Sequence, residues 1–243
     1  MRSISLLALA LGACSTQLGD AGGPEVAGKQ TPAEISLPRS HTGRYLITRD
    51  GKPMGTEHYT VTSSAALWSI EGEITLGWPL DQIQRYRLDY DVVKRRPAGF
   101  EISLSALGET QRVVASNDGT MLRGEVTGII DPVSFEVAYG PGTMIDFGSP
   151  LFGALAFALL ETFLESPEPI AVRSIVVPVP FLRPAVLLQE LRFAGRDGPL
   201  RKVALGPNGR KPAAFWVRAD GIVVKLKTWA DEGGAPFVYE LEP

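Results

Sequence analysis

Paired carboxylates on two segments are the first residues in the sequence that could do chemistry. Glu71 and Glu73 are spaced i and i+2 in LWSIEGEITL, and Asp89 and Asp91 have the same spacing in QRYRLDYDVV. Two acids held close together can serve as general acid and base, or can hydrolyse a glycosidic bond. In a strand, however, i and i+2 side chains share one face, and acids on one face commonly form the solvated side of a sheet. We therefore expect these four carboxylates to face water.

Histidine is too scarce for the common catalytic and metal-binding arrangements. The chain has two histidines, His41 and His58, and they are not spaced as a metal-binding pair. The sequence contains no G-x-S-x-G, H-E-x-x-H or P-loop motif. We expect His58 to face solvent from a strand. We predict no metal, no cofactor and no catalytic residue, and a hydrolase is the least favoured of the functions considered.

The single cysteine, Cys14, ends a segment that is typical of an export signal. Arg2 is followed by an apolar run over residues 4–11 and then by small residues, which is the order of a secretory signal. The run is too short to span a bilayer, which takes about 20 residues. The stretch LGAC, residues 11–14, resembles the lipobox of bacterial lipoproteins. That resemblance implies cleavage before a lipidated Cys14, and an ordinary secretory signal is the alternative.

With the expected cleavage before Cys14, the sequence divides into three segments. We expect a signal peptide at residues 1–13, the lipidated cysteine with a flexible tether at 14–40, and one β domain at 41–243. The tether is rich in Gly and Pro and has no sustained hydrophobic period. Several acyl chains would anchor the protein stably to a membrane. In lipoproteins, Ser15 after the cysteine implies the outer membrane of a bacterial envelope, facing the periplasm.

Alternation of polar and apolar residues dominates the domain from residue 44 onward. The period of two is clear in residues 67–76, 84–93, 99–107 and 133–139, and it is the pattern of strands with one buried face. About 12 short strands, separated by turn signals, predict a single antiparallel sheet curled into a half-barrel or open barrel. The net charge of −3 is scattered along the chain, so no basic stripe indicates a nucleic-acid partner.

One segment, GSPLFGALAFALLETFLESPEP at residues 148–169, breaks the alternation. Ser149 is a good N-cap, Pro150 suits a first helical turn, and Ser166 followed by Pro167 ends the pattern, which predicts a helix over 150–164. Its apolar arc is wider than the roughly 100° that a helix on one face of a sheet needs. We expect this helix to cover or plug the concave face of the sheet.

Two hairpin sequences resemble those of a known group. The opening segment GRYLITRDGKPMGTEHYTV (residues 43–61) and the closing segment FWVRADGIVVKLKTW (residues 215–229) resemble the first and last hairpins of periplasmic domains of a proposed glycolipid-binding type. In layout those domains are similar to the lipoprotein carriers and receptors of the Lol system. The resemblance implies a curled sheet whose concave face holds a lipid beneath helices. This chain has one evident helix where the Lol carriers have several.

These observations predict a lipid-anchored periplasmic protein that binds a hydrophobic or amphipathic ligand, either a lipid or a glycolipid. The alternative is a structural or assembly lipoprotein of the envelope that contacts another protein and has no ligand cavity. Arginines beside an apolar strand could hold a lipid phosphate or carboxylate, or could simply be surface residues. The residues expected to line the ligand site are Leu151, Phe152, Leu155, Leu159 and Phe163 of the helix, Trp68 of the sheet, and Arg173 and Arg183.

The substitution Leu155→Asp distinguishes the predicted ligand-binding function from the structural alternative. If the helix is a mobile lid, the variant keeps a folded sheet and loses ligand uptake. If the helix is packed core, the variant unfolds, because a buried unpaired charge is very costly. Thermal melts measured beside a lipid-binding assay distinguish these outcomes.

Overall fold

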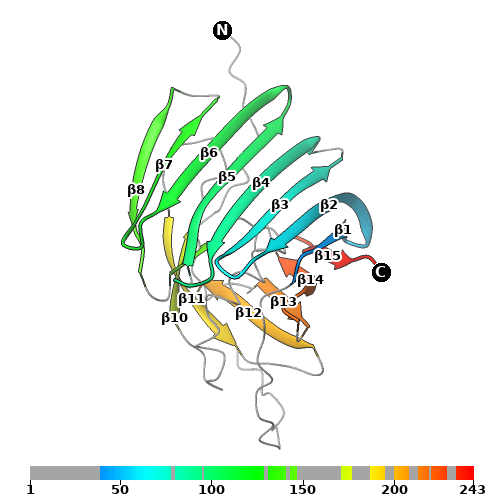
Figure 1. Cartoon of the computed structure of the whole chain (residues 1–243). Coiled ribbons are helices and arrows are strands. Elements are labelled where there is room, and N and C mark those ends of the chain that lie inside the picture. Colours follow the sequence, from blue (N-terminus) through cyan, green and yellow to red (C-terminus); the bar gives the residue numbers. More distant parts are fainter. Residues whose placement is uncertain are drawn as a thin grey trace, which may run out of the picture.

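The computed structural model describes the β domain in eleven stretches of chain. These are residues 39–77, 80–94, 96–128, 131–140, 143–146, 171–176, 187–194, 200–207, 213–218, 220–228 and 234–243. Within them, all the regular structure is β-strand (Figure 1). The predicted signal peptide at 1–13, the predicted tether up to residue 38 and the predicted helix over 150–164 lie outside the described residues.

Fifteen strands form one continuous sheet in the described part of the chain. They are β1 (His41–Arg49), β2 (Lys52–Ser63), β3 (Leu67–Leu76), β4 (Gln82–Asp91), β5 (Arg96–Ala106), β6 (Glu109–Asn117), β7 (Met121–Thr127), β8 (Val133–Ala138), β9 (Thr143–Asp146), β10 (Ala171–Val176), β11 (Leu187–Ala194), β12 (Arg201–Pro207), β13 (Ala213–Val217), β14 (Val223–Thr228) and β15 (Phe237–Leu241).

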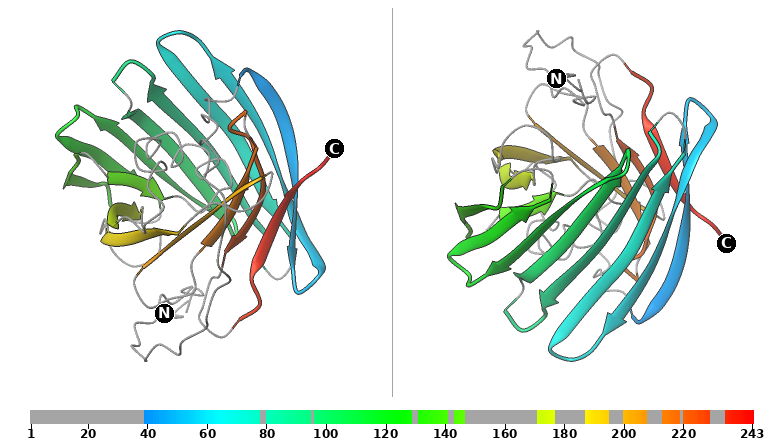
Figure 2. Two further views of the ribbon diagram at one scale, coloured as in Figure 1. Left: turned by 90° about the horizontal axis from the view of Figure 1, so that it is seen from below. Right: turned by 90° about the horizontal axis from the view of Figure 1, so that it is seen from above.

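The strand order is β8-β7-β6-β5-β4-β3-β2-β1-β15-β14-β13-β12-β11-β10-β9. Almost every strand therefore pairs with its neighbour in sequence, as in an up-and-down meander, and β1–β15 is the long-range exception. The sheet curls round an interior (Figure 2) and does not close, because β8 and β9 are its two edges. The predicted single curled antiparallel sheet is confirmed, although the strands number fifteen rather than about 12.

One pair departs from the antiparallel pattern. β9 and β10 run parallel, with Thr143 opposite Arg173 and Asp146 opposite Val176. A parallel pair needs a crossover connection of a dozen or more residues. The 24 residues from 147 to 170 connect these two strands, so the segment that breaks the alternation in the sequence also marks the change of strand direction.

Alternation along each strand sends every second side chain to the inner face. In β3, Trp68, Ile70 and Ile74 are buried, whereas Ser69, Glu71 and Glu73 are polar and more exposed. The buried side chains of many strands meet in one core, which explains why the period-two segments of the sequence became strands. Its fully buried large members are Trp68, Tyr45, Tyr90, Ile47, Ile70, Leu88 and Leu122.

Two-residue turns join several of the hairpins. Asp50 and Gly51 both have positive φ (53° and 71°), as do Leu107 and Gly108 (54° and 81°). Positive φ at both central residues matches the twist of the flanking strands, and Asp-Gly is a preferred sequence for it. The Asp50-Gly51 turn therefore has the preferred sequence, whereas Leu107 occupies its turn without such a sequence preference.

A row of alternating glycine and tyrosine crosses the first four strands. The register places Gly43 opposite Tyr59, Tyr59 opposite Gly72, and Gly72 opposite Tyr86. Each tyrosine ring lies over the neighbouring glycine, because a Cβ on Gly43 would stand 2.4 Å from the Tyr59 ring and a Cβ on Gly72 would stand 2.3 Å from the Tyr86 hydroxyl. The glycines make room for two buried aromatic rings on the inner face.

We expect Gly72→Ala to lower the free energy of unfolding by about 1–3 kcal/mol, the usual cost of overpacking. The added methyl meets the Tyr86 ring and lies 2.9 Å from the His58 carbonyl oxygen, and Tyr86 cannot turn away without losing its bond to Glu57. Gly77→Ala is the control, because its Cβ would be 3.7 Å from the nearest atom, the Met54 oxygen. Urea unfolding measures both variants, and equal midpoints would contradict the expectation.

Candidate functional site

The predicted ligand residues fall mostly outside the described part of the chain. Trp68 is on the inner face of β3 and is 1% exposed, with its ring edge-on to Tyr90 at a centroid distance of 6.4 Å. Arg173 is in β10, and nothing is described of its side chain. Cys14, Arg183 and the residues of the predicted helix, Leu151, Phe152, Leu155, Leu159 and Phe163, lie outside the described residues.

The acidic pairs that opened the sequence analysis face the outside of the sheet, as predicted. Glu71 pairs with Arg87 at 3.3 Å and Glu73 with Arg85 at 2.7 Å, both across the β3–β4 ladder. These side chains are substantially exposed, and ion pairs of this kind contribute little to stability. They form a solvated face and not an acid–base pair.

Asp89, Asp91 and His58 are also on the outer side of their strands. Asp89 accepts a hydrogen bond from the Ser69 hydroxyl at 2.6 Å and pairs with Arg87 at 3.2 Å. Asp91 ends β4 and pairs with Lys94 at 3.3 Å. His58 is exposed. The expectation that these side chains face solvent is confirmed.

Glu57 is a buried acid that the sequence analysis missed. Its side chain points inward from β2 and its exposed fraction is 0%. The Tyr86 hydroxyl on β4 donates a hydrogen bond to its Oε1. A signal was present in GTEHYTVT: if His58 faces solvent and Tyr59 faces inward, the alternation places Glu57 on the inner face with Tyr59. Acids are almost never fully buried unless they are paired, so this position is chemically distinctive.

Tyrosines from other strands gather near this carboxylate. Tyr45 stacks on Tyr59 at a centroid distance of 5.3 Å and donates a hydrogen bond to the Val223 carbonyl oxygen at 2.6 Å. The Tyr59 hydroxyl lies 3.3 Å from Nε2 of His41, whose ring meets it edge-on. The cluster therefore runs from the half-buried end of β1 to the buried centre of the sheet.

Burial and the negative charge of Glu57 act together on the tyrosine hydroxyls. Burial raises the pKa of Tyr45 well above its ordinary value, and the Glu57 carboxylate raises this pKa further. The pKa of Tyr239 is raised by the same two causes, and that of Tyr59 is raised chiefly by burial. At physiological pH these side chains are neutral hydrogen-bonding groups. The cluster can orient a polar group of a ligand.

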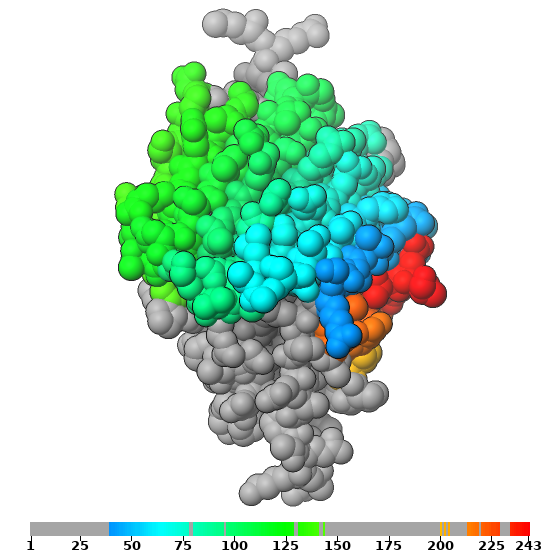
Figure 3. All heavy atoms as spheres, viewed as in Figure 1, coloured from blue at the N-terminus to red at the C-terminus, as the bar shows by residue number. Residues whose placement is uncertain are grey.

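A second feature is a hollow of about 860 Å³ on the outer face, across β1–β5. Figure 3 views this face, where the side chains of β1–β8 form one broad surface. Most residues that line this hollow are polar or charged, and they include Arg44, Arg85, Arg87, Glu71 and Glu73. The sequence pattern does not predict a concave surface on this side of the sheet.

Among the described residues, no three His, Cys, Asp or Glu side chains are placed to hold a metal ion. In the same ranges, no helix has the length and apolarity that a membrane crossing requires.

Two solved structures resemble this fold. The chain is similar to a β-barrel-like protein of the domain of unknown function DUF1849 from Brucella abortus, at a TM-score of 0.51 and 11% identity, over 86% of this chain and 98% of that chain. It also matches a DUF1089 family protein from Pseudomonas aeruginosa, at a TM-score of 0.48 and 13% identity, over 82% and 95% of the two chains. No protein-family profile and no curated protein matches the sequence. At 11% identity, the DUF1849 likeness shows a β-barrel-like fold and nothing further.

The raised tyrosine pKa values predict a delayed alkaline titration. Of the six tyrosines, Tyr45, Tyr59, Tyr139 and Tyr239 have a raised pKa. Folding favours their protonated form, so their contribution to stability is present below the ordinary pKa of about 10 and is lost as the pH rises through the folded-state values. We expect these four to ionise only at higher pH or together with unfolding.

Tyrosinate absorbance recorded beside circular dichroism tests this expectation. The urea-unfolded chain is the control, because all six tyrosines should ionise near the ordinary pKa there. Ionisation of all six near that pH while the sheet is still folded would contradict the expectation.

Proposed function

We propose that this protein is a lipid-anchored envelope protein whose curled sheet binds a hydrophobic or amphipathic ligand, a lipid or a glycolipid, on its inner face. The observation that carries the proposal is the inner lining itself, which combines an apolar and aromatic wall with a buried carboxylate. Ligand sites in proteins are concave and mostly apolar, with a small number of placed polar groups. The role proposed is binding and not catalysis.

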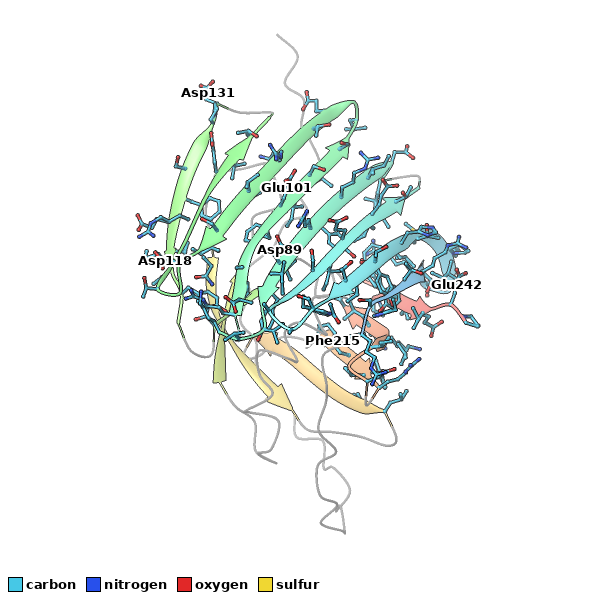
Figure 4. All side chains as sticks on the ribbon, viewed as in Figure 1. Asp89, Glu101, Asp118, Asp131, Phe215 and Glu242 are labelled. Carbon is cyan, nitrogen blue, oxygen red and sulfur yellow. The ribbon has the colours of Figure 1, made fainter. Side chains whose placement is uncertain are left out.

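The apolar part of the lining comes from both halves of the sheet. β1–β7 contribute one group of buried side chains, and β13–β15 contribute another, including Phe215, Val223 and Leu226. Figure 4 shows Phe215 on β13, on the wall of the curled sheet that lies behind β2–β4. Barrels of about eight strands are filled by their own side chains or hold one small ligand, and the interior widens with strand number. A single sheet of fifteen strands supports the expectation of a wider interior.

The polar part of the lining would select for an amphiphile. Glu57 accepts hydrogen bonds, and the neutral hydroxyls of Tyr45 and Tyr59 can both donate and accept. A ligand with a hydroxyl or amide head and an apolar tail would place the head near Glu57 and the tail along the aliphatic wall. A fully apolar ligand would leave these groups without a partner from the ligand, which costs binding energy.

Anchoring and localisation rest on the sequence. The lipobox-like LGAC at residues 11–14 supports a lipidated Cys14, and Ser15 supports the outer membrane, facing the periplasm. The glycine- and proline-rich tether at 14–40 would let the domain move along the membrane surface. A protein that extracts or holds a membrane amphiphile would gain from this arrangement, because the anchor raises its effective concentration near the ligand.

Lipid extraction from the purified full-length Cys14→Ser chain tests the proposal, because this variant carries no acyl anchor of its own. We expect mass spectrometry of the organic extract to find a bound amphiphile, and a fluorescent monoacylglycerol probe, whose head carries neutral hydroxyl groups, to bind saturably. Glu57→Gln should weaken probe binding about tenfold, or 1.4 kcal/mol. Glu125→Gln makes the same chemical change on the exposed side of β7 and should leave probe binding unchanged.

An extract free of amphiphile, together with no saturable probe uptake, would overturn the proposal in favour of an assembly protein that acts through protein contacts. Circular dichroism melts show whether Glu57→Gln is folded. If it is not, the extract and the probe titration of the chain with native Glu57 decide the question.

A further inference from the structure

We propose that the hollow on the outer face of β1–β5 is a second binding site, for an uncharged oligosaccharide lying across the strands. This groove is on the opposite side of the sheet from Glu57 and does not depend on the function proposed above. The inference rests on three properties of the groove: its floor, its walls and its charge.

The floor is the row of alternating glycine and tyrosine. Gly43, Tyr59, Gly72 and Tyr86 are aligned by the strand register and all line the groove. The two tyrosine rings pack on the inner face, where they lie over the glycines. No side chain of this row therefore stands up on the outer side, and the floor there is peptide backbone.

The walls are the two rows of outward side chains on either side of this floor. One wall is formed by Thr42, Thr60, Glu71, Arg87 and Glu101, and the other by Arg44, His58, Glu73, Arg85 and Ser103. Each row crosses five strands, so the groove is about 19 Å long at a strand spacing of about 4.8 Å. Its volume of about 860 Å³ is within the range of ligand-binding sites. Figure 4 shows Glu101 over the middle of this face.

The charges in the groove balance and are already paired. Three arginines, Arg44, Arg85 and Arg87, stand against three glutamates, Glu71, Glu73 and Glu101. The glutamates bond to arginines of neighbouring strands, with Glu101 accepting from Arg112 at 2.7 Å. A balanced groove has no net field to attract a polyanion or a polycation. Donors and acceptors stand side by side along both walls, as hydroxyl groups require, since each hydroxyl both donates and accepts.

Other occupants fit this groove less well. An extended peptide adds to a sheet through unpaired backbone groups at an edge, whereas the floor strands β1–β4 are each paired on both sides. An apolar chain would find polar and charged side chains on both walls. A neutral hydroxyl-rich chain of this length can hydrogen-bond to both walls without having to separate unlike charges from their partners.

Calorimetric titration of the full-length Cys14→Ser chain with maltotetraose, cellotetraose and chitotetraose tests the proposal, with a tetramer of galacturonic acid as the charged comparison. We expect saturable binding of at least one neutral tetrasaccharide and none of the charged one. In the double variant Glu73→Gln/Arg85→Gln, binding should be about tenfold weaker, because the two amides remove the charges of the wall, change its donors and acceptors, and shorten it at position 85.

The control is the double variant Arg123→Gln/Glu136→Gln. This ion pair joins β7 and β8 at 2.8 Å on the same face but outside the groove, and its side chains are about as exposed (52% and 54%) as those of Arg85 and Glu73 (62% and 42%). It should bind like the unmodified groove. The proposal is overturned if no neutral tetrasaccharide binds, if the charged one binds instead, or if both double variants lose binding equally. Because lipid extraction is read out separately, failure here does not bear on the inner site.

Discussion

Among the described residues, the buried apolar side chains of the inner face form one core, and the other features of the sheet must accommodate that burial. The sequence has a single cysteine, Cys14, so no intrachain disulfide stabilises the domain. Each fully buried large side chain, such as Trp68, Ile70 or Leu88, contributes about 1.5–3 kcal/mol relative to exposure. Register is therefore tightly constrained, because a slip of one residue would turn an entire strand inside out. Within this face, Glu57 accepts a hydrogen bond from the Tyr86 hydroxyl.

How far the sequence predicts this structure depends on the strength of the local pattern. Apart from Gly72, polar and apolar residues alternate over 68–76, and this segment became part of β3 with the predicted faces. The outward placement of Glu71 and Glu73 followed from the same pattern. Glu57 was missed although the alternation placed it inward, because an acid is normally read as a solvated residue. The outer groove could not be predicted from the sequence. Its walls form only when residues of five strands are aligned by register, and the pattern within one strand does not specify that register. The parallel β9–β10 pair was missed because the residue pattern of strands this short does not indicate whether two of them pair in parallel or antiparallel.

One row of residues links the two faces of the sheet. Gly43 and Gly72 lack side chains so that Tyr59 and Tyr86 can lie flat over them inside. Tyr86 is thereby held where its hydroxyl reaches Glu57. The same row clears the floor of the groove outside. A substitution in this row is consequently felt on both sides of the sheet, and the two proposed sites share a structural support although their chemistry is different.

The pairing of β1 with β15 separates folding into fast local steps and one slow long-range step. Nearly all other pairs are local hairpins, which close quickly because their loops are short. The antiparallel meanders β1–β8 and β10–β15 can thus form before the slowest step of folding, in which Tyr45 comes opposite Leu241. That junction is reinforced by the Arg44–Glu242 ion pair at 3.0 Å and by the hydrogen bond from Tyr45 to Val223. The first and last strands of the described sheet therefore join its two halves, whereas the two edges of the sheet, β8 and β9, lie near the middle of the sequence.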